Sequence, residues 1–153
     1  MLSLPPDLQI TISEKLWEYC CVQTRRVSSN SKFHLIHFKY LLQIYYTPSM
    51  LYKLGLVGDV RCGHCCAPDA GFLHLAWYCP KIAAYRAAVI SVLQEVMEGL
   101  GDITPFMALL GYAKDMSKLS RSLINMAILL AKCHTSMVWG QGWHPDLQAG
   151  LRI

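Results

Sequence analysis

Apolar side chains recur every three to four positions along most of this chain, a spacing that predicts helices rather than strands. One such stripe runs over residues 6–21, and a polar run from residue 23 to 31 marks its expected end. A second helix is expected from Ser31 to near Tyr46, because Pro48 biases the residue before it away from helical geometry. Pro48 itself can open a short helix that Gly55 ends.

The second half of the chain repeats this pattern after a loop-rich centre. Residues 55–71 are dense in Gly, Pro and Asp, which predicts turns with at most short strands. Pro80 opens a strongly periodic helix that ends at Gly99 or Gly101. Residues 102–111 read as a connection with one short helical turn, and a last long helix is expected from about Met116 to Trp139. The tail, residues 140–153, is expected to be disordered.

Composition makes this one small domain with a core. The chain has 153 residues, of which 54% are hydrophobic and 16% charged. Its longest uncharged stretches reach about ten residues, short of the roughly 18 to 20 that cross a bilayer, so no membrane partner is expected. The N-terminus lacks the basic start and apolar run of a secretory signal. With seven clustered cysteines, an odd number, we expect reduced thiols and an intracellular location, in nucleus or cytoplasm.

Four of those cysteines gather in "RCGHCCAPDAGFLHLAWYC", residues 61–79. Within it, Cys62, Cys65, His74 and Cys79 have the spacing C-x2-C-x8-H-x4-C. Zinc prefers four sulfur or nitrogen ligands in a tetrahedron, and two cysteines separated by two residues can bind one metal from a tight turn. We therefore expect one Zn²⁺ at these four residues.

The proposed ligand set has consequences and open alternatives. Four protein ligands leave no position for water, so the zinc would be structural rather than catalytic. Cys79 directly precedes Pro80, which places its thiolate at the start of the next helix, where exposed amides and the helix dipole favour it. His64 and Cys66 lie beside the ligands and are alternatives to Cys65; the pair Cys62 and Cys65 is preferred because it keeps the two-residue spacing.

Positive charge concentrates around this cluster. Residues 25–86 hold eight basic and two acidic side chains, a net charge of +6 against +4 for the whole chain. Binding to a phosphate backbone is favoured by such patches, and interleaved aromatics can stack on unpaired bases, although the pattern favours core packing for aromatics on helical stripes. The side chains expected to touch phosphates are Arg25, Arg26, Lys32, Lys39, Lys53 and Arg61.

The stretch "FKYLLQIYYTPSMLYKLGLVGDVRCGHCCAPDAGFLHLAWYCPKIAAYRAAVISVL", residues 38–93, carries a family pattern. Its "YYTP", "LYKLGL", paired cysteines and H-x2-W-x-C-P element resemble the zinc-binding segment that follows reverse transcriptase in LINE-type non-LTR retrotransposon polyproteins. The resemblance implies that Cys62, Cys65, His74 and Cys79 are the metal ligands. It also implies binding of RNA or single-stranded DNA during target-primed reverse transcription. Where the family commonly has an aromatic residue after the position of Tyr85, this chain has Arg86.

No catalytic pattern accompanies this resemblance. The chain has no paired-aspartate turn such as Y-x-D-D, which a polymerase needs for its metal ions, and no phosphate-binding glycine loop or G-x-S-x-G elbow. We therefore expect a non-enzyme without a small-molecule substrate. The sequence predicts a mostly α-helical domain around a CCHC zinc knuckle, with segments at 1–30 (helix and linker), 31–101 (zinc knuckle), 102–139 (C-terminal helices) and 140–153 (tail).

The alternative is a zinc-stabilised protein-interaction domain or a degenerate fragment without a selected role. On that hypothesis, an alanine and methionine stripe on the last helix stays partly exposed and meets a protein partner. Its members are Met116, Met126, Ala127, Ala131 and Met137.

Overall fold

The computed structural model describes residues 13–111 and 116–139, and the regular structure of these residues is helical, with no strand. The helices in chain order are α1 (Glu14–Val27), α2 (Ser31–Leu42), α3 (Pro48–Lys53), η2 (His74–Tyr78), α4 (Pro80–Val96), α5 (Pro105–Leu110) and α6 (Lys118–Trp139). The predicted mostly α-helical class is therefore confirmed, and the short strands allowed for the central loop are absent from it. The tail predicted to be disordered lies outside the described residues.

Short polar side chains set the starts of four helices. Ser13, Asn30, Thr47 and Thr104 each accept a hydrogen bond from a backbone N–H in the first turn of α1, α2, α3 and α5. Proline follows directly in α3 and α5, where its missing N–H costs nothing. The short helical turn expected between residues 102 and 111 is α5.

Three helix ends differ from the sequence-based prediction, and one of them is that of α4, which ends at Val96 rather than at Gly99 or Gly101. Helix α1 continues to Val27 instead of ending before Gln23, because Gln23 and Thr24 are buried and so belong to its inward face. Helix α2 ends at Leu42 rather than near Tyr46, because Gln43 adopts left-handed backbone geometry with φ of 53°. The end of α1 was therefore predicted too early from polarity alone. The end of α2 was missed because it depends on a positive φ at a non-glycine residue, which the sequence does not indicate.

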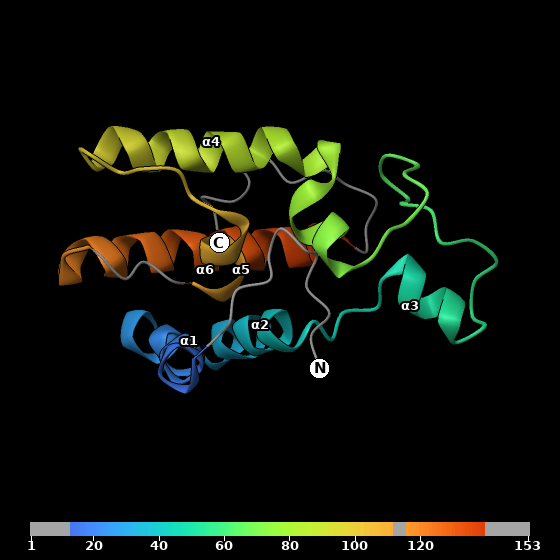
Figure 1. The fold of residues 1–153 in the computed structure, drawn as a ribbon, viewed down its shortest axis with the longest axis horizontal. Helices are drawn as coiled ribbons and strands as arrows, with labels where there is room; N and C mark the ends of the chain where they lie inside the picture. Colours follow the sequence, from blue (N-terminus) through green and yellow to red (C-terminus); the bar gives the residue numbers. More distant parts are fainter. Residues whose placement is uncertain (1–12, 112–115, 140–153) are drawn as a thin grey trace.

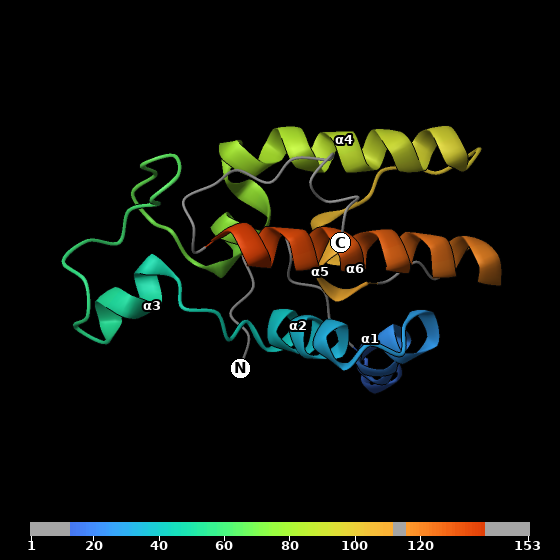
Figure 2. The same ribbon diagram turned by 180° about the vertical axis from the view of Figure 1, so that it is seen from behind.

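The helices form three layers, and α6 lies in the middle one. Figures 1 and 2 show α4 on one side of α6, running antiparallel to it, with α1 and α2 on the other side. Contacts between α6 and each of α1, α2 and α4 hold these layers together, while α5 packs against α2. Helix α3 and the loop after it protrude at one end of the molecule (Figure 1). We call α1, α2, α5 and α6 the helical bundle, and residues 55–79 the metal loop.

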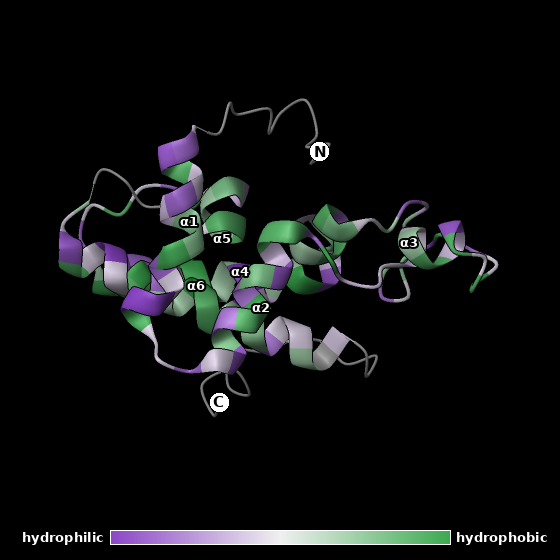
Figure 3. Ribbon diagram, turned by 90° about the horizontal axis from the view of Figure 1, so that it is seen from below, coloured by the Kyte–Doolittle hydropathy of each residue, from purple (hydrophilic) through white to green (hydrophobic). Residues whose placement is uncertain are grey.

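The bundle is closed by apolar side chains from all four of its helices. Cys20, Leu41, Phe106 and Leu110 form one buried cluster, and Ile124 and Ile128 of α6 form another. Figure 3 shows the apolar turns of α5 and α6 in the interior of the molecule, with more polar turns at the outer ends of α1 and α6. Burial of these side chains is the main favourable contribution to folding of the bundle.

A chain of polar groups crosses the same interior. The Lys132 ammonium donates to the Leu109 carbonyl at 2.7 Å and lies 3.1 Å from Nδ1 of His37. On its other side, Nε2 of His37 lies 2.8 Å from the Cys20 carbonyl, which requires the proton on Nε2 and leaves Nδ1 as acceptor. Burial lowers the pKa of His37 to about 3 and that of Lys132 to about 7, so the imidazole is neutral.

Gly111 closes this polar chain at the end of α5. It has φ of +70°, and a Cβ atom there would lie 2.2 Å from Nε2 of Gln23. Gln23 is itself buried and lies 3.2 Å from Nε2 of His37. Only glycine therefore fits both the backbone angle and the close approach of α1.

Candidate metal centre

Four side chains of the metal loop converge as the sequence predicts. The ligand atoms of Cys62, Cys65, His74 and Cys79 all lie within 4.8 Å of one another. Sγ of Cys62 is 3.8 Å from Sγ of Cys79, and Sγ of Cys65 is 3.3 Å from Nε2 of His74. All seven cysteines are free thiols, so a disulfide does not explain the convergence.

These distances fit a tetrahedral metal ion. A zinc ion with bonds of about 2.3 Å to sulfur and about 2.0 Å to nitrogen sets ligand atoms about 3.8 Å apart for two sulfurs and about 3.5 Å for sulfur and nitrogen. The Cys62 to Cys79 separation equals the first value, and the Cys65 to His74 separation is close to the second. The donor set of three sulfurs and one imidazole nitrogen is one that structural zinc sites use. The residues present therefore fit a closed metal centre.

A tight turn presents the first two cysteines. The backbone N–H of Cys66 donates to the Cys62 carbonyl at 2.8 Å, and the N–H of Cys62 donates to the Ala67 carbonyl at 3.0 Å. Cys66 closes the turn with φ of 60°, a left-handed geometry that costs energy for any residue other than glycine. This turn folds residues 62–65 so that both thiols face the same side.

A π-helical turn presents the other two ligands. In η2 the N–H of Cys79 donates to the His74 carbonyl at 2.7 Å, the five-residue spacing that defines a π turn. In an α-helix, residues five apart project about 140° from each other, so His74 and Cys79 would diverge. The wider turn lets both side chains reach one ion. The sequence-based prediction placed no helix here, because the turn is too short for a periodic signal.

Cys79 joins the centre to the next helix, as predicted. It is the residue before Pro80 at the start of α4, although its side chain makes no capping hydrogen bond. Burial raises the pKa of the Cys79 thiol to about 12, and the N–H of Lys81 opposes this shift. A metal ion would supply the positive charge that a buried thiolate needs.

The other two ligands, Cys65 and His74, are half-buried. At Cys65, burial raises the pKa, but hydrogen bonds from the Ala67 N–H and from the neighbouring thiols lower it overall. Burial also lowers the pKa of His74, against the opposing charge of Asp69, which keeps the imidazole neutral and able to bind a metal. Both shifts favour the protonation states that coordination requires.

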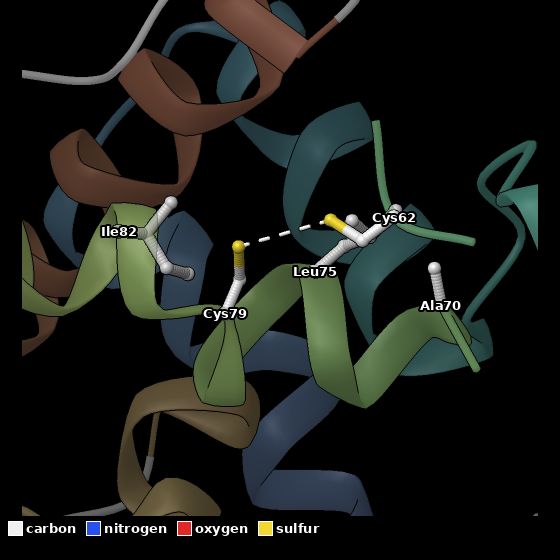
Figure 4. Close-up of a cluster of buried hydrophobic side chains, with 5 residues drawn as sticks. All are labelled: Cys62, Ala70, Leu75, Cys79 and Ile82. Atoms are coloured by element: carbon white, nitrogen blue, oxygen red, sulfur yellow. Dashed lines mark hydrogen bonds between the residues drawn. The ribbon is translucent and has the colours of Figure 1, made fainter. Parts of the chain in front are cut away.

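Apolar contacts seal the centre on its inner side. Figure 4 shows Cys62 and Cys79 pointing toward each other, within a cluster that also contains Ala70, Leu75 and Ile82. Cys62 and Cys79 are each 1% exposed. Trp139, near the end of α6, packs against this cluster and also stacks on Tyr40 of α2 at 6.1 Å. The metal loop is thus attached to the bundle through the last turn of α6.

The alternatives to Cys65 lie outside this centre. The convergent group contains Cys65 and neither His64 nor Cys66. Cys66 is exposed, since the turn directs its side chain to solvent, and His64 is half-buried. The geometry therefore favours the two-residue spacing of Cys62 and Cys65.

The predicted phosphate contacts spread over several elements. Arg25 and Arg26 are exposed in the last turn of α1, Lys32 and Lys39 lie on α2, Lys53 ends α3, and Arg61 is in the metal loop. Helices α1 and α3 lie at opposite ends of α2 (Figures 1 and 2), so the residues on these helices do not gather in one compact patch. Arg61 pairs with Asp59 at 3.2 Å, and Arg26 and Lys39 lie over the rings of Tyr19 and Tyr45.

The aromatic side chains divide into core and surface. Tyr45 packs edge-on against Tyr40 and Trp139, so it belongs to the core. Trp77 is half-buried, and Arg86 covers its ring at 4.5 Å while donating to its carbonyl. Tyr46 and Tyr52 remain exposed. Arg86 thus connects η2 to α4.

Sequence reasoning missed two sets of polar residues. The Lys132 and His37 chain gave no signal, because His37 sits on the apolar stripe of α2 and Lys132 is one of several lysines on a helix. Lys118 and Arg121, in the first turn of α6, did carry a signal. Two cations at the start of a helix oppose its dipole, and such a placement is a reason to look for an anion.

No helix in the described part of the chain has both the length and the hydropathy of a membrane span. The chain matches no protein-family model, no curated protein and no solved structure.

Proposed function

We propose that this chain is a non-catalytic zinc-binding module that binds RNA or single-stranded DNA. The observation that carries the proposal is the convergence of three thiols and one imidazole at distances that suit tetrahedral zinc. The resemblance of residues 38–93 to the segment behind LINE-type reverse transcriptases supplies the setting, which is target-primed reverse transcription in nucleus or cytoplasm. In that setting the metal is structural, because four protein ligands fill its coordination shell.

In this proposal, two groups of residues have separate roles. The ligands Cys62, Cys65, His74 and Cys79 would fix the turn before η2 to the start of α4. The basic side chains of α1, α2 and α3 would contact a phosphate backbone, and the exposed rings of Tyr46 and Tyr52 would stack on unpaired bases.

Metal content is the first test. Elemental analysis of the purified wild type should give one zinc per chain, while Cys62→Ser and His74→Ala should lose it. Cys66→Ser and His64→Ala are matched controls and should retain it, since neither residue belongs to the convergent group. A folded wild type without bound metal, after purification in zinc, would refute the metal centre.

Nucleic-acid binding needs a separate test. Affinity for a single-stranded oligouridine should fall steeply with salt, and each lost phosphate contact should reduce the slope by about 0.7. Arg25→Glu and Lys32→Glu should reduce it, whereas Lys15→Glu, an exposed charge on α1 outside the predicted set, should not. An affinity that does not change with salt would rule out this function.

A protein-interaction domain remains the second candidate, and one observation favours it. Leu35, Phe38 and Leu42 lie on one face of α2 and are exposed, as are Leu54 and Leu56 beyond α3. The stripe predicted on α6 is also partly open, with Met137 exposed. Self-association in the analytical ultracentrifuge that Phe38→Glu abolishes, together with no binding of oligouridine, would support this candidate.

A further inference from the structure

A hollow of about 430 Å³ lies between α1 and the start of α6, away from the metal centre. Three cationic side chains line it: Arg26 from the end of α1, and Lys118 and Arg121 from the first turn of α6. Its other lining residues are Tyr19, Gln23, Val27, Ser122 and Asn125, so none of the described residues around it is acidic. We call this hollow the α1/α6 pocket.

The three cations of this pocket lack carboxylate partners. Within residues 13–111 and 116–139, none of them forms a salt bridge; Arg26 lies over the Tyr19 ring at 5.8 Å. Lys118 and Arg121 also stand at the N-terminal, positive end of a 22-residue helix, whose first turn holds no acidic residue. Cations there oppose the helix dipole and one another, and an anion between them would relieve both effects.

Two buried amides at the pocket point to the same class of ligand. Asn125 is 3% exposed and Gln23 is 4% exposed, and Oδ1 of the first and Oε1 of the second have no hydrogen-bond partner. Each amide already has one contact: Nδ2 of Asn125 donates to the Tyr19 hydroxyl at 3.3 Å, and Nε2 of Gln23 lies 3.2 Å from Nε2 of His37.

A half-turn of each amide preserves those contacts. The Tyr19 hydroxyl can donate to Oδ1 as readily as it accepts from Nδ2, and the protonated Nε2 of His37 can donate to Oε1 of Gln23 but cannot accept from its NH₂. After the half-turn each NH₂ group is the unpartnered group. A buried NH₂ needs an acceptor, and both residues belong to the lining of the pocket.

We propose that the α1/α6 pocket binds a phosphate group. Tetrahedral phosphate oxygens accept several hydrogen bonds at once, and a planar guanidinium such as that of Arg121 donates two of them in parallel. A phosphate on a nucleic-acid strand and one on a small phosphorylated molecule share this chemistry. The site shares Arg26 with the nucleic-acid contacts proposed above, but Lys118 and Arg121 belong to this site alone, so variants at these two residues test it separately.

Inorganic pyrophosphate is the first probe, titrated calorimetrically into the zinc-loaded chain at physiological ionic strength. Lys118→Glu and Arg121→Glu should each weaken binding by about tenfold or more, because each removes a charged contact and adds a repulsive one. Both variants place an acid in the first turn of α6, where the dipole favours it, so their melting temperatures without pyrophosphate should not fall. Lys15→Glu makes the same change of charge on α1 outside the pocket and should bind like wild type.

The result decides the proposal in either direction. Absence of pyrophosphate binding to wild type, or an equal loss in Lys15→Glu, would overturn the site. If binding follows the expected order, oligouridine added as competitor identifies the source of the phosphate. Displacement of pyrophosphate supports a nucleic-acid phosphate, and no displacement supports a small phosphorylated molecule. If oligouridine does not bind while pyrophosphate does, the nucleic-acid function fails and the pocket stands.

Discussion

The metal loop and the helical bundle differ in the side chains that they bury, and so in what stabilises their folded structure. The bundle buries large side chains from four helices, such as Leu41 of α2 and Ile124 of α6. Helix α3, which leads into the metal loop, has no buried residue, and Leu54 and Leu56 after it are exposed. The buried side chains of the loop are two of the proposed metal ligands, Cys62 and Cys79, with Ala70, Leu75 and Phe72, of which Phe72 packs against Tyr40 and Leu109.

This difference shows what each region depends on. Apolar burial can sustain the bundle without a ligand, whereas the loop has too little apolar area to offset the entropy of ordering its backbone. The bundle, in turn, carries a cost that the loop does not, since it encloses Lys132 with no carboxylate partner among the described residues. We therefore expect the loop to depend on metal, and the bundle to respond to pH and to small changes in volume.

Removal of the metal should separate the two regions most clearly. Binding of structural zinc can contribute on the order of 10 kcal/mol to folding of a small module, so Cys62→Ser or a chelator should unfold the metal loop. Hydrogen exchange should show lost protection over residues 60–79 and retained protection in α1, α2 and α6. Cys66→Ser is the control and should exchange like wild type. Equal loss of protection in the bundle would show that the regions do not fold separately.

A single methyl group in the bundle should have the next largest effect. Gly111→Ala combines a left-handed backbone with displacement of the buried Gln23 amide, so we expect a loss of about 3 kcal/mol in the free energy of unfolding. Gly55→Ala has the same φ of +70° but open space around the added Cβ, and should lose about 1 kcal/mol. Urea unfolding of both variants measures the difference. Equal losses would mean that Gln23 moves aside freely.

The buried lysine should make stability depend on pH. Burial lowers the pKa of Lys132 from 10.5 to about 7, so between these values the unfolded chain binds more protons and stability rises with pH. Burial also raises the pKa of Cys20 and Cys133 to about 11, so ionisation of the unfolded thiols reduces stability above about pH 9. From pH 7 to pH 9, the contribution of Lys132 should therefore be a rise of about 2 kcal/mol.

Lys132→Met tests this source of the pH dependence. The variant keeps most of the volume and removes the titrating group, so its unfolding free energy should lack that rise. His37, whose pKa is lowered from 6.5 to about 3 in the folded chain, adds only a small rise near pH 7, where the unfolded imidazole still binds some protons. The comparison uses the difference between the two proteins at each pH, which removes contributions from the metal ligands. The same rise in both proteins would exclude Lys132 as its cause.

The smallest expected effect concerns the turn that presents the first ligands. Cys66→Gly should raise the stability of the metal-bound chain by about 1 kcal/mol, because glycine adopts the φ of 60° without strain. Its metal content should not change. Cys66→Ala removes the same thiol but keeps the Cβ atom, and should give no gain. A loss of metal in either variant would make Cys66 a ligand and contradict the convergent group.

The sequence predicted those features that depend on residues close together in the chain. Proline at the first position located the starts of α3 and α4, one short helical turn was expected where α5 lies, and the Cys and His spacing selected the four convergent residues. It did not find the end of α2, which depends on a positive φ at Gln43, or the π turn, which depends on how His74 and Cys79 meet in space. The α1/α6 pocket unites residues more than ninety positions apart, and no window along the chain contains both sides.

The π turn of η2 also sets which changes of chain length the metal centre tolerates. A π turn is an α turn with one residue more, so deletion of one residue between His74 and Cys79 would let the segment close as an ordinary α turn. The two ligands would then be four apart and still on one face. An insertion would place them six apart, about 120° from each other around an α-helix, so they would diverge. A chain one residue shorter, with H-x3-C in an α turn, would therefore present the same two ligands on one face as the H-x4-C of this chain does in a π turn.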